Sequence, residues 1–159
     1  EVWGVELDLS TPLTAFGLDD TGVFLNYSWL DSEIEDAFGV RRFNDQSRNV
    51  FNAGFIQQLP SVAASFGASY RKQGDAFGRI VGEEIVTSYG ADLEVFVEKR
   101  FGEQWTLRLT GSNLIDASKD EVFDKFTTLD DQANRDYDEY ELETESAGPV
   151  YQLIARYSF

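Results

Sequence analysis

The stretch Gly148-Pro-Val-Tyr-Gln-Leu-Ile-Ala-Arg-Tyr-Ser-Phe159, at the carboxyl end of the chain, decides the fold class. Every second residue in it is apolar or aromatic: Tyr151, Leu153, Ala155, Tyr157 and Phe159. The residues between them include the polar Gln152, Arg156 and Ser158. A repeat of two residues is that of a β-strand, whose side chains point alternately to opposite faces. The stretch therefore predicts an amphipathic strand that ends on an aromatic residue.

Earlier runs show the same alternation, at residues 3–10, 23–29, 49–59, 62–71, 89–98 and 105–110. In the first of them, Trp3, Val5, Leu7 and Leu9 are apolar, and the residues between them are small, polar or charged. We expect about seven antiparallel strands of roughly ten to fifteen residues. Such strands are longer than the ~5–6 residues typical of globular sheets, and a tilted strand of this length can cross a membrane.

The connections between these runs alternate between short and long. Short turns are expected at 14–21, 59–61 and 101–104, and long polar loops at 31–48, 72–88 and 116–148. Bacterial outer-membrane barrels have short periplasmic turns and long external loops. The last strand then ends on the periplasmic rim. The aromatic residues Trp3 and Tyr151 would mark one rim, and Phe101, Trp105, Tyr157 and Phe159 the other.

Composition excludes several classes of function. The formal net charge of -16 and the pI near 4.2 argue against a nucleic-acid partner, which needs clustered basic residues. The chain has no His and no Cys, so imidazole bases, thiolate nucleophiles and nearly all zinc chemistry are absent. No apolar run is long enough for a transmembrane helix. We therefore expect no enzyme, no catalytic residue, no metal site and no cofactor.

The segments Trp105–Asp116 and Gly148–Phe159 together resemble the closing strands of TonB-dependent outer-membrane receptors. Asn113, Leu114 and Asp116 match the "N-L-x-D" pattern of that family's penultimate strand. Upstream, residues 4–7 and 26–33 are similar to earlier strands of the family's barrel.

The resemblance implies a plugged barrel of about 22 strands, of which residues 1–159 would form the C-terminal part. The plug and the TonB-contacting box are expected to lie outside this chain. The implied function is uptake of a siderophore, vitamin or oligosaccharide across the outer membrane of a Gram-negative bacterium. The implied partners are outer-membrane lipid, the remaining strands and plug of the same receptor, TonB through the missing N-terminal part, and the barrel-assembly machinery.

Two groups of candidate residues follow. Tyr151, Leu153, Ala155, Tyr157 and Phe159 resemble the β-signal that the barrel-assembly machinery reads, although an ordinary amphipathic strand could also end a domain in this way. Charged residues on the polar faces of the strands are expected to face the lumen: Glu6, Asp8, Arg71, Asp92, Glu94, Glu98, Arg108 and Arg156. We favour cross-strand ion pairs and plug contacts for them over a solute path. Asp92 and Glu94 are also spaced as a glycosidase acid and base could be, but no partner motif accompanies them.

The segment 116–145 holds twelve acidic residues against three basic ones, a local charge of -9. Oxygen ligands suit calcium, but the spacing matches no calcium loop, and a solvated external loop is the favoured interpretation. The glycine-rich residues 74–82 lack phosphate-loop spacing and are also predicted to be loop.

An odd number of strands leaves two open edges, so we expect an incomplete barrel. Counting residues 136–144 as an eighth strand is possible, but it would place the C-terminus on the wrong rim. A small stand-alone β-barrel, acting as a binding or structural outer-membrane protein, is the alternative function.

Overall fold

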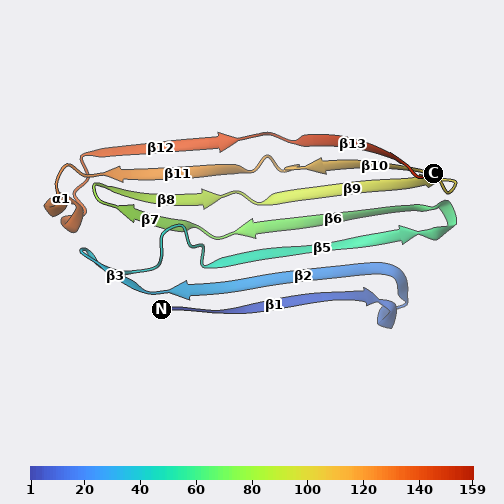
Figure 1. The fold of residues 1–159 in the computed structure, drawn as a ribbon, viewed down its shortest axis with the longest axis horizontal. Coiled ribbons are helices and arrows are strands. Elements are labelled where there is room, and N and C mark those ends of the chain that lie inside the picture. The colour runs from blue at the N-terminus through green and yellow to red at the C-terminus, as the bar shows by residue number, and fades with distance from the viewer.

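The computed structural model describes residues 1–159, and its strands form extended antiparallel sheets (Figure 1). The largest, here called the long sheet, has seven strands in the order β1-β2-β5-β6-β9-β10-β13. Its strands are β1 Val2–Leu13, β2 Leu18–Ser32, β5 Asn49–Leu59, β6 Ala64–Gln73, β9 Asp92–Phe101, β10 Trp105–Ser112 and β13 Val150–Tyr157. The expected all-β antiparallel fold is confirmed, and it includes a seven-stranded sheet, although the chain has thirteen strands in all.

A second antiparallel sheet, the distal sheet, extends beyond one end of the long sheet in the order β12-β11-β8-β7. Its strands are β7 Ala76–Ile80, β8 Glu83–Tyr89, β11 Ser118–Lys125 and β12 Glu139–Ser146. A hairpin of β3 Ile34–Asp36 and β4 Gly39–Arg41 and the helix α1 Leu129–Asn134 complete this end. We call it the distal end, and the opposite one the near end.

The prediction of long loops at 31–48, 72–88 and 116–148 was therefore wrong, and so was that of a loop at 74–82. These segments contain short strands in which charged, polar and glycine residues interrupt the hydrophobic alternation. In β12, for example, Glu141 and Glu143 flank the only aliphatic residue, Leu142. Pairing with β11 rather than apolar periodicity makes this segment a strand.

Residues 136–144 largely become strand β12, but that strand does not add an eighth member to the long sheet. It pairs with β11 in the distal sheet and then leads into β13. The C-terminus therefore stays at the near end, while the N-terminus lies toward the distal end (Figure 1).

Short connections close the strand pairs at the near end. The 3-10 turns Thr14–Phe16 and Pro60–Val62 join β1 to β2 and β5 to β6, and residues 102–104 join β9 to β10. Gly17 and Gly102 adopt φ of 74° and 63°, a region that glycine enters without steric cost. Val62, expected in a strand, belongs to the second turn. The alternation of short connections at one end and longer segments at the other is thus present.

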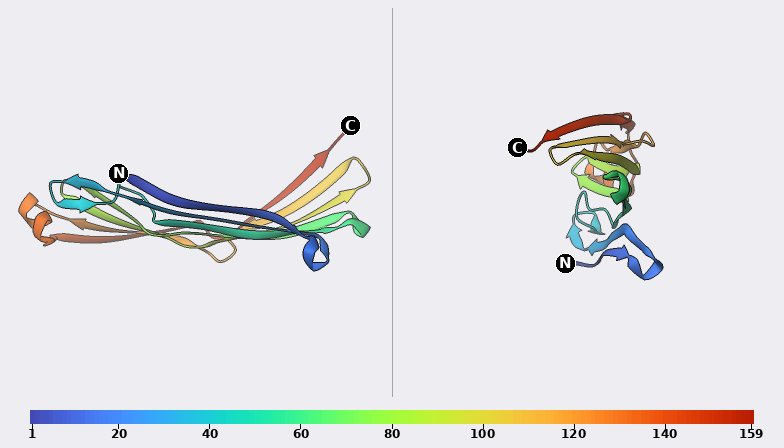
Figure 2. Two further views of the ribbon diagram at one scale, coloured as in Figure 1. Left: turned by 90° about the horizontal axis from the view of Figure 1, so that it is seen from below. Right: turned by 90° about the vertical axis from the view of Figure 1, so that its right-hand side faces the viewer.

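The long sheet is curved and open (Figure 2). Its edge strands β1 and β13 bend toward the same side but do not pair with each other. A closed barrel is not formed, and a membrane-spanning role remains a prediction.

Little of the chain is buried. Only ten of the 159 residues are buried, and among them only Ala76 and Phe126 are hydrophobic core residues, both at the distal end. The long sheet is a single layer, whereas soluble domains bury their apolar surfaces between two layers. No helix is long and apolar enough to span a membrane.

Candidate functional site: the two faces of the long sheet

Strand register separates the side chains of the long sheet into two chemically different faces. Residues directly opposite each other in antiparallel strands share a face. One such row runs through Val23, Phe55, Ala68, Val95, Gly111 and Tyr151. Every residue in it is apolar or aromatic except for the single glycine. The face that contains this row is called the apolar face, and the other the polar face.

Many large side chains of the apolar face are exposed, and the others are half-buried. Leu7 of β1 is 52 % exposed and Leu153 of β13 is 70 % exposed. Exposed large hydrophobics on this face occur on all seven strands: Trp3, Val5, Leu7, Leu9, Tyr27, Phe55, Phe66, Tyr70, Val97, Trp105, Leu109, Tyr151, Leu153 and Tyr157. A contiguous apolar surface of this extent marks a site of contact with another apolar phase or molecule.

Aromatic residues gather at the near end of this face. The rings of Trp105 and Tyr157 lie 4.9 Å apart, and those of Tyr157 and Phe159 lie 6.2 Å apart. Phe101 is directly opposite Trp105 in the register. The expected cluster is therefore present, although its role as a membrane-interface girdle stays a prediction.

The predicted β-signal residues belong to an edge of the long sheet. Tyr151, Leu153, Ala155 and Tyr157 are on the apolar face of β13, and Phe159 lies just beyond its end. The backbone N–H of Ser158 donates to the carbonyl of Gln104 at 2.9 Å, which holds the chain end against the neighbouring turn. Recognition of these residues by the barrel-assembly machinery stays a prediction.

The charged residues predicted to face a lumen do share one face. Asp8, Asn26, Asn52, Arg71 and Asp92 form one row of the polar face. Glu6, Glu94, Glu98, Arg108 and Arg156 have the same parity on their strands and lie on this face too. Ion pairing among them is sparse, because only Glu98 and Arg108 form an ion pair, at 3.7 Å.

Two phenylalanines on the polar face were not among the predicted site residues. A Cβ added to Gly54 would lie 2.6 Å from Cζ of Phe24, and one added to Gly67 would lie 2.7 Å from Cε1 of Phe96. Each ring therefore covers a glycine of the adjacent strand. The break in alternation at Phe24, together with a glycine in the neighbouring strand, is the sequence signal that could have found this arrangement.

These rings border a small hollow on the polar face, of about 140 Å³. The guanidinium of Arg108 lies 3.9 Å from the centre of the Phe96 ring, within the range of a cation–π contact. Ile56, Ser69 and Glu94 of the polar face also line it, together with Phe55 and Ala68.

The family-motif residues lie at the joint between the two sheets, where β10 ends and β11 begins. Asn113 and Asp116 both have φ of 52°. The Asn113 side chain donates to the carbonyl of Gly148 at 3.1 Å and accepts from the N–H of Ala117 at 2.7 Å. Its own N–H donates to Asp92 at 2.9 Å. Asn113 thus ties three neighbouring strand connections together.

Leu114 and Asp116 continue this joint. The N–H of Leu114 donates to the carbonyl of Leu93 at 3.1 Å, and the Asp116 carboxylate accepts from the hydroxyl of Ser146 at 2.8 Å. The motif therefore has a structural explanation in this chain. It connects β10 to β11 and keeps this connection hydrogen-bonded to the segments beside it.

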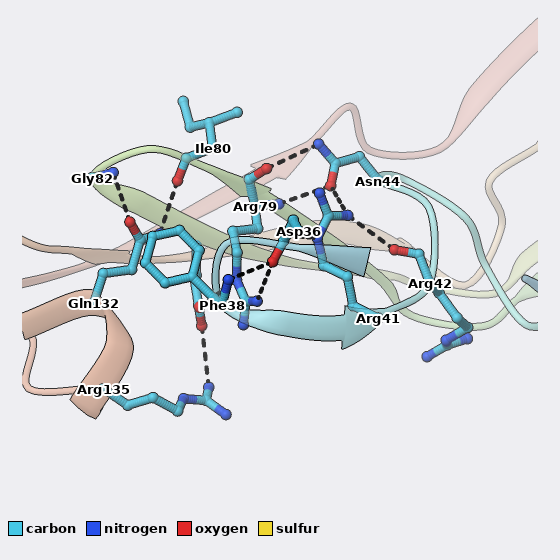
Figure 3. Close-up of polar contacts among 11 residues, drawn as sticks. Asp36, Phe38, Arg41, Arg42, Asn44, Arg79, Ile80, Gly82, Gln132 and Arg135 are labelled. Atoms are coloured by element: carbon cyan, nitrogen blue, oxygen red, sulfur yellow. Dashed lines mark hydrogen bonds and ion pairs between the residues drawn. The ribbon is translucent and has the colours of Figure 1, made fainter. Parts of the chain in front are cut away.

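An ion-pair cluster fastens the distal end (Figure 3). Arg79 on β7 pairs with Glu84 at 2.7 Å and with Asp36 at 3.6 Å, and Arg41 pairs with Asp36 at 2.5 Å. Glu84 is 2 % exposed, and Arg135 approaches its other oxygen to 3.3 Å. The hydrogen bond from Arg41 and that from the backbone of Phe38 lower the pKa of Asp36.

The helix α1 is attached to the same end through one buried side chain. Gln132 is 1 % exposed, donates to the carbonyl of Ile80 at 2.8 Å and accepts from the N–H of Gly82 at 3.0 Å. These bonds hold the turn between β7 and β8 (Figure 3). A capping box between Thr128 and Asp131 starts the helix.

The acidic segment 116–145 forms the β11–β12 hairpin with α1 between its strands. Lys125 pairs with Glu139 and Glu141 at 3.0 and 2.6 Å, and these bonds raise the pKa of Lys125. No group of three or more carboxylates that could hold a metal ion is present.

No protein-family model matches this chain, and neither the curated proteins nor the solved structures contain a match to it.

Proposed function

We propose that residues 1–159 form part of the wall of an outer-membrane β-barrel, with the apolar face toward lipid and the polar face toward the lumen. The observation that carries this proposal is the apolar face itself. It is continuous across all strands of the long sheet, exposed, and bordered at the near end by aromatic rings. In lipid, exposed apolar side chains on a barrel wall are favourable, whereas in water such a face favours aggregation.

A soluble β-protein does not account for this distribution. A domain of about 150 residues buries roughly 70 % of the surface of its unfolded chain, which requires two packed layers. Here the long sheet has one layer and the buried hydrophobic residues are at the distal end. The distal sheet would extend from the membrane into water on the cell exterior, and the near turns would face the periplasm.

Within this class we propose a TonB-dependent receptor that takes up a scarce nutrient, such as a siderophore, vitamin or oligosaccharide. Support comes from the resemblance of the last strands to the closing strands of that family. The motif residues Asn113 and Asp116 also form hydrogen bonds to the segment that leads into the last strand. The open edges β1 and β13 fit a sheet that is continued by further strands. The unpaired charges of the polar face fit contact with a plug or with lumenal water.

The molecular mass of the intact protein distinguishes the receptor from the alternative, a small stand-alone barrel. An antibody raised against the β11–β12 hairpin should detect, in isolated outer membranes, a heat-modifiable protein several times larger than 18.0 kDa. A protein near 18.0 kDa would support the stand-alone barrel instead. Detection only in the soluble fraction would refute both.

Face orientation is tested by single cysteines, since the chain has none of its own. An environment-sensitive dye at Val95→Cys or Leu153→Cys should be quenched by lipid-attached quenchers in vesicles of the intact protein. The same dye at Thr110→Cys or Gln152→Cys, one residue out of phase, should not be. Equal quenching at both sets would overturn the lipid-facing assignment.

A further inference from the structure

The edges of the long sheet differ from each other in charge. On the polar face of β1, Glu6 and Asp8 make no ion pair, and their neighbours on β2 are the uncharged Ser28 and Asn26. On the polar face of β13, Arg156 makes no ion pair and is opposite Thr106. One edge of the polar face is therefore acidic and the other is basic.

The same edges run in the same direction. Every neighbouring pair in the sheet of seven strands is antiparallel, so β1 and β13 both run from the distal end to the near end (Figure 1). A strand antiparallel to either edge must run from the near end to the distal end. Each edge exposes backbone N–H and C=O groups, which cannot remain unpaired in hydrocarbon.

We propose that β1 and β13 are each flanked by a strand that runs from the near end to the distal end, and that these two strands have opposite charges on the polar face. The strand beside β1 carries Lys or Arg opposite Glu6 and Asp8. The strand beside β13 carries Asp or Glu opposite Arg156. Both present apolar residues to lipid, and in this respect the proposal rests on the barrel-wall function.

A second copy of this chain is the competing partner for both edges. Charge alone would favour it, because the acidic β1 edge of one copy would lie beside the basic β13 edge of the next. Direction opposes it, since two copies with the same orientation in the membrane would place these edges parallel. Parallel pairing is somewhat less stable per residue, and bacterial single-chain barrels are antiparallel throughout. The flanking strands are therefore not the β1 or β13 strand of a second copy.

Charge reversal in the intact membrane protein tests this inference. Cross-strand opposite charges stabilise a sheet and like charges destabilise it by similar amounts. Glu6→Lys combined with Asp8→Lys should lower the amount of heat-modifiable barrel about tenfold. The neutral pair Glu6→Gln with Asp8→Asn should lower it less. Arg156→Glu should lower it about threefold, whereas Arg156→Lys should leave it unchanged. Glu33→Lys with Glu35→Lys, which makes the same charge change at two exposed carboxylates of the distal end that form no ion pair, is the matched control and should have no effect.

Two results would overturn the proposal. One is a wild-type amount of barrel from the Glu6→Lys, Asp8→Lys variant, which would mean that no basic strand lies beside β1. The other is a disulfide between separate copies when Leu7→Cys and Leu153→Cys chains are produced together, which would identify a second copy as the neighbour. The dye-quenching pattern decides the lipid-facing assignment separately, so failure of the charge prediction alone leaves the barrel wall intact.

Discussion

The long sheet and the distal end are both built from antiparallel strands, yet their side chains are organised in opposite ways. Among the ten ion pairs of the chain, only Glu98 with Arg108 joins two strands of the long sheet. The distal end contains the buried ion pair of Glu84 with Arg79 and the buried amide of Gln132. The long sheet instead exposes apolar residues from all seven of its strands on one face.

This difference fits the proposed barrel wall, in which the long sheet is in contact with lipid and the distal end is in water. Buried, paired polar groups of the distal end are what a small folded unit in water needs, because unpaired ones are costly. Exposed leucines and aromatic rings on a single-layer sheet are favourable only where that face is covered. Between β10 and β11, the change from one kind of side-chain organisation to the other occurs at the joint that contains Asn113.

The largest expected effect comes from a charge on the apolar face. Leu109→Arg on β10 should cost about 2–4 kcal/mol of folding free energy in lipid vesicles, because a guanidinium at mid-membrane loses its hydration. Val86→Arg on β8 of the distal sheet, also at an exposed apolar position, should change it by less than about 0.5 kcal/mol. Urea titration of vesicle-embedded protein measures both. Equal costs at the two positions would remove the proposed difference in solvent.

A second change acts on the distal end alone. Gln132→Leu leaves the N–H of Gly82 and the carbonyl of Ile80 without their partner, which should cost about 2 kcal/mol. Amide exchange at Gly82 should become faster while exchange in β9 and β10 stays unchanged. Gln104→Leu in an exposed near turn is the control. Simultaneous loosening of the long sheet would show that the two parts unfold as one unit.

The long sheet was predictable from sequence because most of its residues alternate between apolar and polar. In β1, for example, Val5, Leu7 and Leu9 follow a period of two that no helix shares, and the short turns fix which strands are neighbours. The charged residues of the polar face were found for the same reason, since parity alone assigns them. Only Glu98 and Arg108 form one of the cross-strand ion pairs that we expected among them. Pairing depends on side-chain geometry between strands, which parity does not define.

The distal end was missed because its strands are stabilised by polar contacts between distant segments. Nothing near Asp36 in sequence indicates that Arg79 will reach it, and nothing near Gln132 points to the turn at Gly82. Charge-rich strands such as β12 lack apolar alternation and so resemble solvated loops. The phenylalanines that cover Gly54 and Gly67 depend on strand register, which a single sequence defines poorly.

A smaller effect is expected at the joint between the two parts. Asn113→Ala removes both side-chain hydrogen bonds. It keeps a β-carbon at positive φ without the bonds that favour Asn in this conformation, so it should cost about 1–2 kcal/mol of folding free energy. Asn113→Gly loses the same bonds but accommodates the φ, and should cost less. Thermal unfolding measures the difference. If Ala and Gly were equally destabilising, backbone conformation would not contribute to the joint.

The smallest expected effect is a pH dependence confined to the distal end. Hydrogen bonds from Arg41 and the Phe38 backbone lower the pKa of Asp36 below its ordinary value of 3.8. A carboxylate whose pKa is lower in the folded state stabilises folding above its unfolded pKa, and this contribution is lost as pH falls through the folded value. Protection of the β3–β4 hairpin against amide exchange should therefore decline in acid below about pH 4 and be constant near neutrality. In Asp36→Asn this acid dependence should disappear. Amide exchange in the long sheet should be the same in both proteins, because Asp36 does not contact that sheet. A decline of equal size in both would assign the acid sensitivity to other carboxylates of the distal end and separate it from the Asp36 ion pairs.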